Sequence, residues 1–234
     1  MILEDVNTFD PELKNKGVYL VSLGSLEQHG HYAPLGTDSF IQDAFLEKVK
    51  TSLPEVRYLP TIPIGTSWQH LDFNGTLSFR PETLYSMISD IVACLKASAS
   101  TIVFVSWHGG NKPVVNDFIE KEQSSLLDIK LGQITFGDEG TDEKAESLLH
   151  GFVDDHAGNT EVSLMLAIRP DITTKPGAED AKQNVHFEWD KRIIQATPDG
   201  TIDEHPRWVA TSEIGNRLIE IYSDNLITKL RAFL

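Results

Sequence analysis

Short apolar runs alternate along the chain with stretches in which apolar residues recur at helical spacing. Four runs have the length and side-chain character of buried strands, although Pro60 and Pro63 interrupt the second: 17–23, 58–64, 101–105 and 129–136. Apolar residues three or four positions apart predict four helices, at 40–49, 82–96, 159–168 and 214–230. We also expect helix after Asn111, and an exposed loop or helix start at the acidic stretch 138–146.

Strands that alternate with helices predict an α/β fold in which a mostly parallel sheet is covered on both faces. No repeat or low-complexity linker divides the 234 residues, so we expect one domain over 1–234. In such sheets, functional residues gather at the carboxyl ends of the strands. Three polar clusters follow predicted strands and a fourth precedes a predicted helix: 24–31, 65–70, 106–111 and 154–161.

Composition and charge narrow the class of partner. The net charge of −15 argues against binding to nucleic acid or to anionic membranes, and its plainest explanation is solubility. The single cysteine, Cys94, excludes a disulfide within the chain and is expected to be a buried filler of an apolar helix. No apolar run approaches the ~20 residues that span a bilayer, and the first five residues do not resemble a signal peptide. We therefore expect a cytoplasmic protein.

The polar clusters contain residue types that bind divalent metal ions. Glu27 and His29 are two apart after the first strand, Asp38 follows, and His108 lies between a strand and two glycines. Carboxylate and imidazole ligands without sulfur suit Zn²⁺ or Mn²⁺. The supply of carboxylates favours two ions, with Asp38 as the bridge between them. The alternative for any single one of these residues is that it caps a turn or a helix.

The fourth cluster adds a candidate for proton transfer. His156 is the best general acid or base, because imidazole titrates near neutral pH. It could instead be a further metal ligand or a helix cap. Glu161 should lie in the first turns of the following helix, where the alternative explanation is a favourable charge at a helix N-terminus.

Other residues in these clusters are candidates for contact with a substrate. Trp68, His70 and Trp107 could stack on a flat molecule, although tryptophans also occur in ordinary cores and subunit interfaces. The candidate substrate-binding residues are Ser67, Trp68, His70, Trp107 and Gly109.

Four stretches together resemble the creatininase (creatinine amidohydrolase) family: 24–30 with 34–38, 65–78, 108–111 and 156–163. A weaker match lies at 206–215, so the resemblance extends from about residue 20 to about residue 220. It implies a three-layer α/β/α sandwich, a two-metal centre and a homo-oligomer, often a hexamer. The implied metals are Zn²⁺ and Mn²⁺, with Fe²⁺ as a third option.

The resemblance also implies roles for individual residues. One ion is expected at Glu27, Asp38 and His108, and the other at His29 and Asp38. The family's creatininase completes the second ion with a glutamate two residues after the metal-binding histidine, where this chain has Gly110. We expect Glu161 to take its place. His156 matches the family's catalytic histidine, and Glu161 is counted with it as a candidate catalytic residue.

The implied reaction is hydrolysis of a small non-peptide amide. A hydroxide held between two ions would attack the amide carbon, and His156 would protonate the departing nitrogen. One alternative is a deformylase of a formylamino-pyrimidine nucleotide, whose phosphate would need Lys112, Arg80 or Arg207. The others are a hydrolase that trims a peptide during cofactor maturation, and a metal-binding sensor without turnover. A plain scaffold without metal would require all the ligand-type residues to be incidental.

Overall fold

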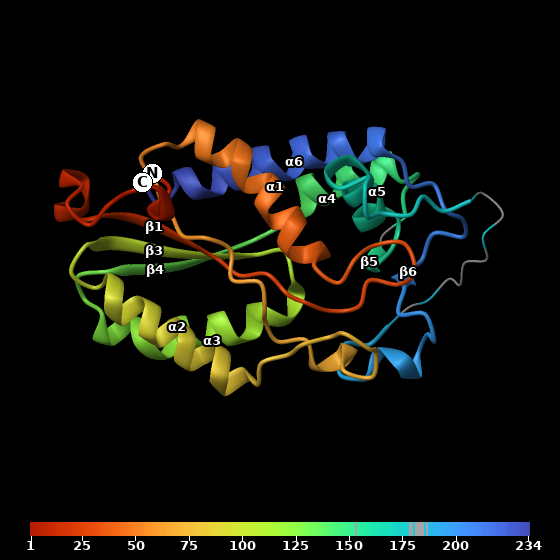
Figure 1. Cartoon of the computed structure of the whole chain (residues 1–234), viewed down its shortest axis with the longest axis horizontal. Helices are drawn as coiled ribbons and strands as arrows, with labels where there is room; N and C mark the ends of the chain where they lie inside the picture. The colour runs from red at the N-terminus through yellow and green to blue at the C-terminus, as the bar shows by residue number, and fades with distance from the viewer. Residues whose placement is uncertain (153, 178–179, 181–184, 186) are drawn as a thin grey trace.

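A four-stranded parallel sheet in the order β2-β1-β3-β4 forms the middle layer of the computed structural model, which describes residues 1–152, 154–177, 180, 185 and 187–234 (Figure 1). The strands are β1 (Gly17–Ser22), β2 (Arg57–Tyr58), β3 (Ala99–Ser106) and β4 (Lys130–Thr135). Ser22 pairs with Val105, and Ser106 pairs with Thr135. The carboxyl ends of β1, β3 and β4 therefore meet at one edge of the sheet.

Helices cover both faces of the sheet (Figure 1). One face carries α1 (Thr37–Ser52), α4 (Glu139–Leu148), α5 (Asn159–Ile168) and α6 (Ser212–Arg231). The other carries α2 (Pro81–Leu95) and α3 (Lys112–Glu122). A small antiparallel pair, β5 (Asp154–His156) and β6 (Ile202–Asp203), lies beyond the end of the sheet. Short 3₁₀ helices lie at Leu3–Asp5, Pro11–Lys14, Trp68–His70, Gly109–Asn111, Gln123–Ser125 and Ile193–Gln195.

The sheet separates two apolar cores. Leu20 of β1 packs with residues of α1, α5 and α6, whereas its neighbours Tyr19 and Val21 pack with residues of α2 and α3. Successive side chains of a strand point to opposite faces, so a strand that is buried on both faces is apolar throughout. The continuous apolar runs of the sequence arise in this way. The predicted three-layer α/β/α fold is confirmed.

Two predicted elements differ in extent from the structure. The strand expected at 58–64 is reduced to Arg57–Tyr58 and one bridge between Leu23 and Ile62. Pro60 and Pro63 lack the N–H that a longer ladder requires. The acidic stretch after Asp138 forms α4, whose first turn is capped where the Asp138 side chain accepts a hydrogen bond from the Thr141 N–H at 3.0 Å.

The prediction that Cys94 is buried is wrong, because its side chain is exposed. The buried stripe of α2 consists of Leu84, Ile88 and Val92. Cys94 lies two residues beyond Val92 and therefore points away from the sheet. No described helix has the length and apolar content needed to cross a membrane.

Asn111 joins three loops at the carboxyl edge of the sheet. Its side-chain N–H groups donate to the Gly24 carbonyl at 2.9 Å and to the Ser106 hydroxyl at 3.1 Å. Its Oδ1 accepts from the Thr66 N–H at 3.0 Å. A Cβ on Gly65 would lie 2.3 Å from Asn111 Oδ1, so this close approach requires glycine. The loops after β1, β2 and β3 are thus held together by one buried side chain.

We predict that Asn111→Leu lowers the free energy of unfolding, because it leaves the Gly24 carbonyl and the Thr66 N–H buried without a partner. The expected cost is about 1–3 kcal/mol for each orphaned group. Urea unfolding is the measurement, with Asn116→Leu on the exposed side of α3 as the control, expected within about 0.5 kcal/mol of the parent chain. Equal effects of the two substitutions would contradict the role given to Asn111.

Candidate metal centre

Six ionisable side chains converge at the carboxyl edge of the sheet, and each is at most 6 % exposed. The loop after β1, the first turn of α1, the loop after β3, the end of β5 and the first turn of α5 supply them. They are Glu27, His29, Asp38, His108, His156 and Glu161, all of which were expected at the site. The structure therefore brings together residues that lie as much as 134 positions apart, from Glu27 to Glu161 (161 − 27).

One group of potential metal ligands consists of Glu27, Asp38 and His108. His108 Nδ1 lies 3.2 Å from Glu27 Oε1 and 3.4 Å from Asp38 Oδ2. The Ser25 hydroxyl also donates to Asp38 Oδ2. These three residues are the set predicted for the first ion.

A second group consists of His29, Asp38 and Glu161. His29 Nε2 lies 3.7 Å from Asp38 Oδ1 and 3.6 Å from Glu161 Oε2. The two oxygens of Asp38 thus face different histidines, as expected of a carboxylate that bridges two ions. These are the residues predicted to hold the second ion, with Glu161 in place of a carboxylate at 110.

Gly110 cannot carry a side chain without local rearrangement. A Cβ at this position would lie 2.2 Å from the Thr66 carbonyl oxygen and 2.5 Å from His108 Nε2. The packing of Thr66 and His108 against Gly110 therefore leaves no room for a glutamate at this position.

His156 faces the same cluster from β5. Its Nδ1 lies 3.8 Å from Glu27 Oε1 and 4.0 Å from Glu161 Oε2, and Glu27, His29 and His156 form a third group that could hold an ion. Both sequence-based interpretations of His156, proton transfer and metal ligation, remain compatible with this position.

Main-chain carbonyls orient two of the candidate histidine ligands. The Nδ1–H of His29 donates to the Glu27 carbonyl at 3.0 Å, and the Nε2–H of His108 donates to the Thr66 carbonyl at 2.7 Å. Each bond leaves the other ring nitrogen, Nε2 of His29 and Nδ1 of His108, turned toward the carboxylates. Hydrogen bonds of this kind are the usual support of metal-binding histidines.

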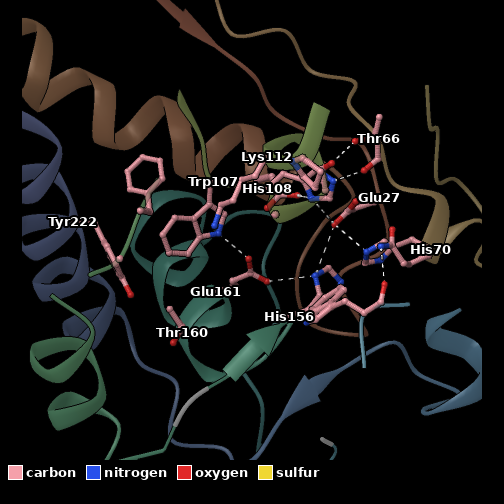
Figure 2. A pocket seen from close by; sticks show the side chains of 18 of the residues that line it. Glu27, Thr66, His70, Trp107, His108, Lys112, His156, Thr160, Glu161 and Tyr222 are labelled. Atoms are coloured by element: carbon pink, nitrogen blue, oxygen red, sulfur yellow. Dashed lines mark hydrogen bonds and ion pairs between the residues drawn. The ribbon is translucent and has the colours of Figure 1, made fainter. Parts of the chain in front are cut away.

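Hydrogen bonds hold both oxygens of Glu161, and Figure 2 shows the one from Trp107. Oε1 accepts from the Trp107 indole N–H at 2.8 Å, and Oε2 accepts from the Ala157 N–H at 2.7 Å. Ala157 has a φ of 57°, a left-handed conformation that is strained for a residue other than glycine. The turn before α5 thus holds a strained residue whose N–H is directed at the carboxylate.

The unpartnered atoms of the cluster fit a divalent metal. Within the described part of the chain, Glu27 Oε2 and His29 Nε2 are buried and have no hydrogen-bond partner. Buried polar atoms without partners are rare because each one costs free energy. Both atoms are of types that can ligate a metal, and the donor set of carboxylate oxygens and imidazole nitrogens suits Zn²⁺ or Mn²⁺.

The buried carboxylates of the cluster favour positive charge on the neighbouring histidines. Burial lowers the pKa of His29, but Glu161 and Asp38 outweigh it and raise that pKa to about 10. Burial also opposes the charged form of His108, yet Glu27 and Asp38 hold its pKa well above the ordinary value. Protons on these two rings balance the carboxylates in the chain alone, so metal ions would compete with protons for the same atoms.

The pKa values of Glu161 and His156 shift toward the neutral forms of these groups. Burial raises the pKa of Glu161, although His29 opposes the shift. Burial, followed by the nearby His29 and His70, holds the pKa of His156 well below its ordinary value. This shift favours the neutral form of the His156 ring.

A cavity of about 770 Å³ opens onto the cluster. It extends past Trp107 to Asp142 and Glu146 of α4 and Tyr222 of α6. Four of the five predicted substrate-binding residues line it: Trp68, His70, Trp107 and Gly109.

The fifth, Ser67, is fully buried, and its Oγ lies 3.5 Å from His108 Nε2. Of the described residues that line the cavity, Lys112 is the sole lysine or arginine. Arg80 and Arg207 are exposed at the surface and are not part of this lining.

The indole of Trp107 has a second role that the sequence left open. Besides lining the cavity, it packs edge-on against Phe45 and Tyr222, with ring centroids 5.4 and 5.0 Å away. It is thus both a cavity wall and part of the core.

Four residues of the site were not predicted from the sequence: Gln28, Thr66, Trp189 and Tyr222. Gln28 lies between two predicted ligands, so its position in the motif was an available signal. Thr66 acts through its carbonyl, which no sequence pattern reveals. Trp189 and Tyr222 line the cavity from segments without a motif.

Comparison with known proteins identifies the relatives of this chain. A family model described as creatinine amidohydrolase matches residues 5–230. The mycofactocin precursor peptide peptidase of Mycobacterium ulcerans is 31 % identical over 65 % of this chain and 59 % of its own length. The creatinine amidohydrolase of Pseudomonas putida is 27 % identical over 66 % of this chain and 65 % of its own. The chain thus spans less than two thirds of these curated relatives.

Solved structures share the fold. A manganese creatininase structure superimposes with a TM-score of 0.80 and 21 % identity, covering 99 % of this chain and 97 % of the other. A putative creatinine amidohydrolase from Bacteroides fragilis gives a TM-score of 0.71 with 21 % identity, covering 97 % and 94 % of the two chains.

We predict that Asp38→Asn abolishes or mispairs metal binding, because a neutral amide cannot share a negative charge between two cations. The measurement is zinc and manganese content per chain by mass spectrometry after loading and dialysis. Asp43→Asn, an exposed position on the same helix, is the control and should retain the parent content. Full metal content in Asp38→Asn would refute Asp38 as the bridge.

Proposed function

This chain belongs to the creatininase family, and we propose that it hydrolyses an amide C–N bond with two divalent metal ions, Zn²⁺ or Mn²⁺, at the carboxyl edge of its sheet. The observation that supports this most strongly is the convergence of three buried carboxylates and three histidines at the wall of a large cavity. We propose Glu27, Asp38 and His108 as ligands of one ion and His29, Asp38 and Glu161 as ligands of the other. We further propose that residues 1–234 act as one domain.

The ions, when bound, would polarise the scissile carbonyl and would make water easier to deprotonate, so that it attacks the carbonyl carbon as hydroxide. The chain's own residues supply orientation and proton transfer. His156, neutral and facing Glu27 and Glu161, would take a proton from the attacking water and deliver it to the departing nitrogen. Trp107 would keep Glu161 in position through the hydrogen bond to its Oε1.

The cavity bears on the class of substrate. Its volume of about 770 Å³ lies in the range of drug-sized ligands and far exceeds the space that a single small ring would fill. We infer that the amide belongs to a larger molecule, part of which lies beyond Trp107 near Lys112 and Tyr222. A small nitrogen-rich amide remains the first candidate that the family description suggests.

A second candidate function is removal of a terminal segment from a peptide. The extent of the cavity favours it, and so does the similarity to peptidases that act on a mycofactocin precursor peptide. A formylamino-pyrimidine nucleotide would also fill the space, and Lys112 is the cation that its phosphate would meet. The homo-oligomer and the cytoplasmic location stay predictions.

The proposed function is tested by turnover. Protein loaded with Zn²⁺ or Mn²⁺ is incubated with creatinine, formylamino-pyrimidine nucleotides and short peptides, and products are followed by mass spectrometry. We expect hydrolysis of one class, lost in Asp38→Asn. Bound metal without turnover of any amide would favour a metal-dependent sensor instead.

We predict that His156→Ala keeps its metal and loses turnover by a factor of ~10²–10⁴, the range for a missing general acid or base. His150→Asn, at an exposed histidine, is the control and should keep the parent rate. Metal content and kcat are measured together. Loss of metal from His156→Ala would instead make His156 a ligand.

We predict that Lys112→Met raises KM for a substrate that carries a carboxylate or phosphate, because the substitution removes the half-buried cation that the anionic group would contact in the cavity. A hydrogen bond to a charged group contributes about 1.5–3 kcal/mol, which corresponds to a change in KM of roughly 10- to 150-fold. Paired substrates with and without the anionic group provide the measurement. Lys121→Met, an exposed lysine of the same helix, is the control. An equal rise for both substrates would contradict this role.

A further inference from the structure

The proposed function leaves Gln28 unused, although its buried side chain contacts two histidine rings of the site. Two backbone groups settle which end of the carboxamide is oxygen. The Gly30 N–H donates to Oε1 at 2.9 Å, and Nε2 donates to the Gly200 carbonyl at 3.1 Å. A backbone N–H can only donate and a carbonyl can only accept, so the orientation of the amide is fixed.

The amide nitrogen of Gln28 has one further proton and two neighbouring ring nitrogens. His156 Nε2 lies 2.9 Å from it, and His70 Nδ1 lies 3.1 Å from it. His156 Nε2 also lies 2.8 Å from the main-chain carbonyl oxygen of Gln28. Since a carbonyl only accepts, His156 Nε2 carries a proton and donates it there. The second amide proton of Gln28 therefore goes to His70 Nδ1.

We propose that Gln28 is a positioning residue that, through its carbonyl and its carboxamide, holds His156 and His70 as Nε2–H tautomers. The bare Nδ1 of His156 then faces Glu27 Oε1 at 3.8 Å and Glu161 Oε2 at 4.0 Å. The Nε2–H of His70 points at Glu27 Oε1 at 3.4 Å. This inference rests on the proposed function, because it assigns the atom through which His156 would move a proton.

The opposite tautomer of His156 satisfies fewer groups. Its bare Nε2 would face the carbonyl oxygen of Gln28 at 2.8 Å, which sets two lone pairs against each other. Its Nδ1–H would have no acceptor closer than 3.8 Å. Moreover, an amide proton given to His156 would be withdrawn from His70 or from the Gly200 carbonyl.

The loop around Gly200 is shaped to receive Gln28. Gly200 has a φ of 84°, and a Cβ there would lie 1.9 Å from Gln28 Oε1. Gly30, the donor to the same oxygen, has a φ of 63°. Both backbone partners of the carboxamide therefore occupy left-handed conformations that favour glycine.

The direct test is NMR of the zinc-loaded protein labelled with ¹⁵N in histidine and glutamine. Protonated and bare ring nitrogens differ in chemical shift, and an N–H···N hydrogen bond transmits a coupling between its two nitrogens. We expect proton-bearing Nε2 in both rings and a coupling from Gln28 Nε2 to His70 Nδ1. A coupling to His156 Nε2, or a proton on His156 Nδ1, would overturn the proposal.

A variant then measures the consequence. Gln28→Met should keep zinc, shift the His70 ring resonances and lower kcat about 10- to 100-fold with little change in KM, as for other residues that orient groups at a metal site. Gln123→Met is the matched control, since Gln123, directly after α3, bonds in the described chain only to backbone groups of residues 126–131. Equal kcat values in the two variants would also overturn the proposal.

Failure of this inference is separable from failure of the proposed function. The NMR spectrum reports the tautomers whether or not any amide is turned over. The spectrum of the parent protein decides the matter even if Gln28→Met does not fold.

Discussion

Burial of three carboxylates around the same histidines is the constraint on which the rest of the site depends. Glu27, Asp38 and Glu161 are each at most 6 % exposed, and the ionised form of a buried carboxylate is costly unless positive charge compensates it. His29 and His108 supply part of that charge by holding protons. Divalent ions would supply it more completely and would also occupy the atoms left without partners. The arrangement therefore makes sense as a metal centre rather than as part of an ordinary core.

The fold supplies the rigidity that such a cluster requires. Parallel strands that end at one edge bring together loops from distant parts of the sequence, and Asn111 bonds three of those loops to one another. Backbone carbonyls orient His29, His108 and His156, so the direction of each ring is set by the main chain. The cavity beyond Trp107 is built from α4 and α6, which carry none of the six clustered residues.

The sequence predicts those features that have a local or periodic cause. The β-branched run of β3 and the apolar stripe of α2 identify their elements, and polar residues directly after strands identify the cluster. The strand expected at 58–64 fails because two prolines outweigh an apolar pattern, and Cys94 fails because its position on the helix, not its residue type, decides exposure. Ser67 is buried beside His108 and outside the cavity lining, a position that its place in a motif does not reveal. The cavity walls Trp189 and Tyr222 depend on tertiary packing and leave no trace in the local sequence.

The most direct test of the central claim is X-ray diffraction from crystals grown with zinc, with data collected on both sides of the zinc absorption edge. Two anomalous peaks are predicted, one among Glu27, Asp38 and His108 and the other among His29, Asp38 and Glu161. Both peaks should contact Asp38, through different carboxylate oxygens. No peak at the cluster, with zinc bound elsewhere on the chain, would contradict the account.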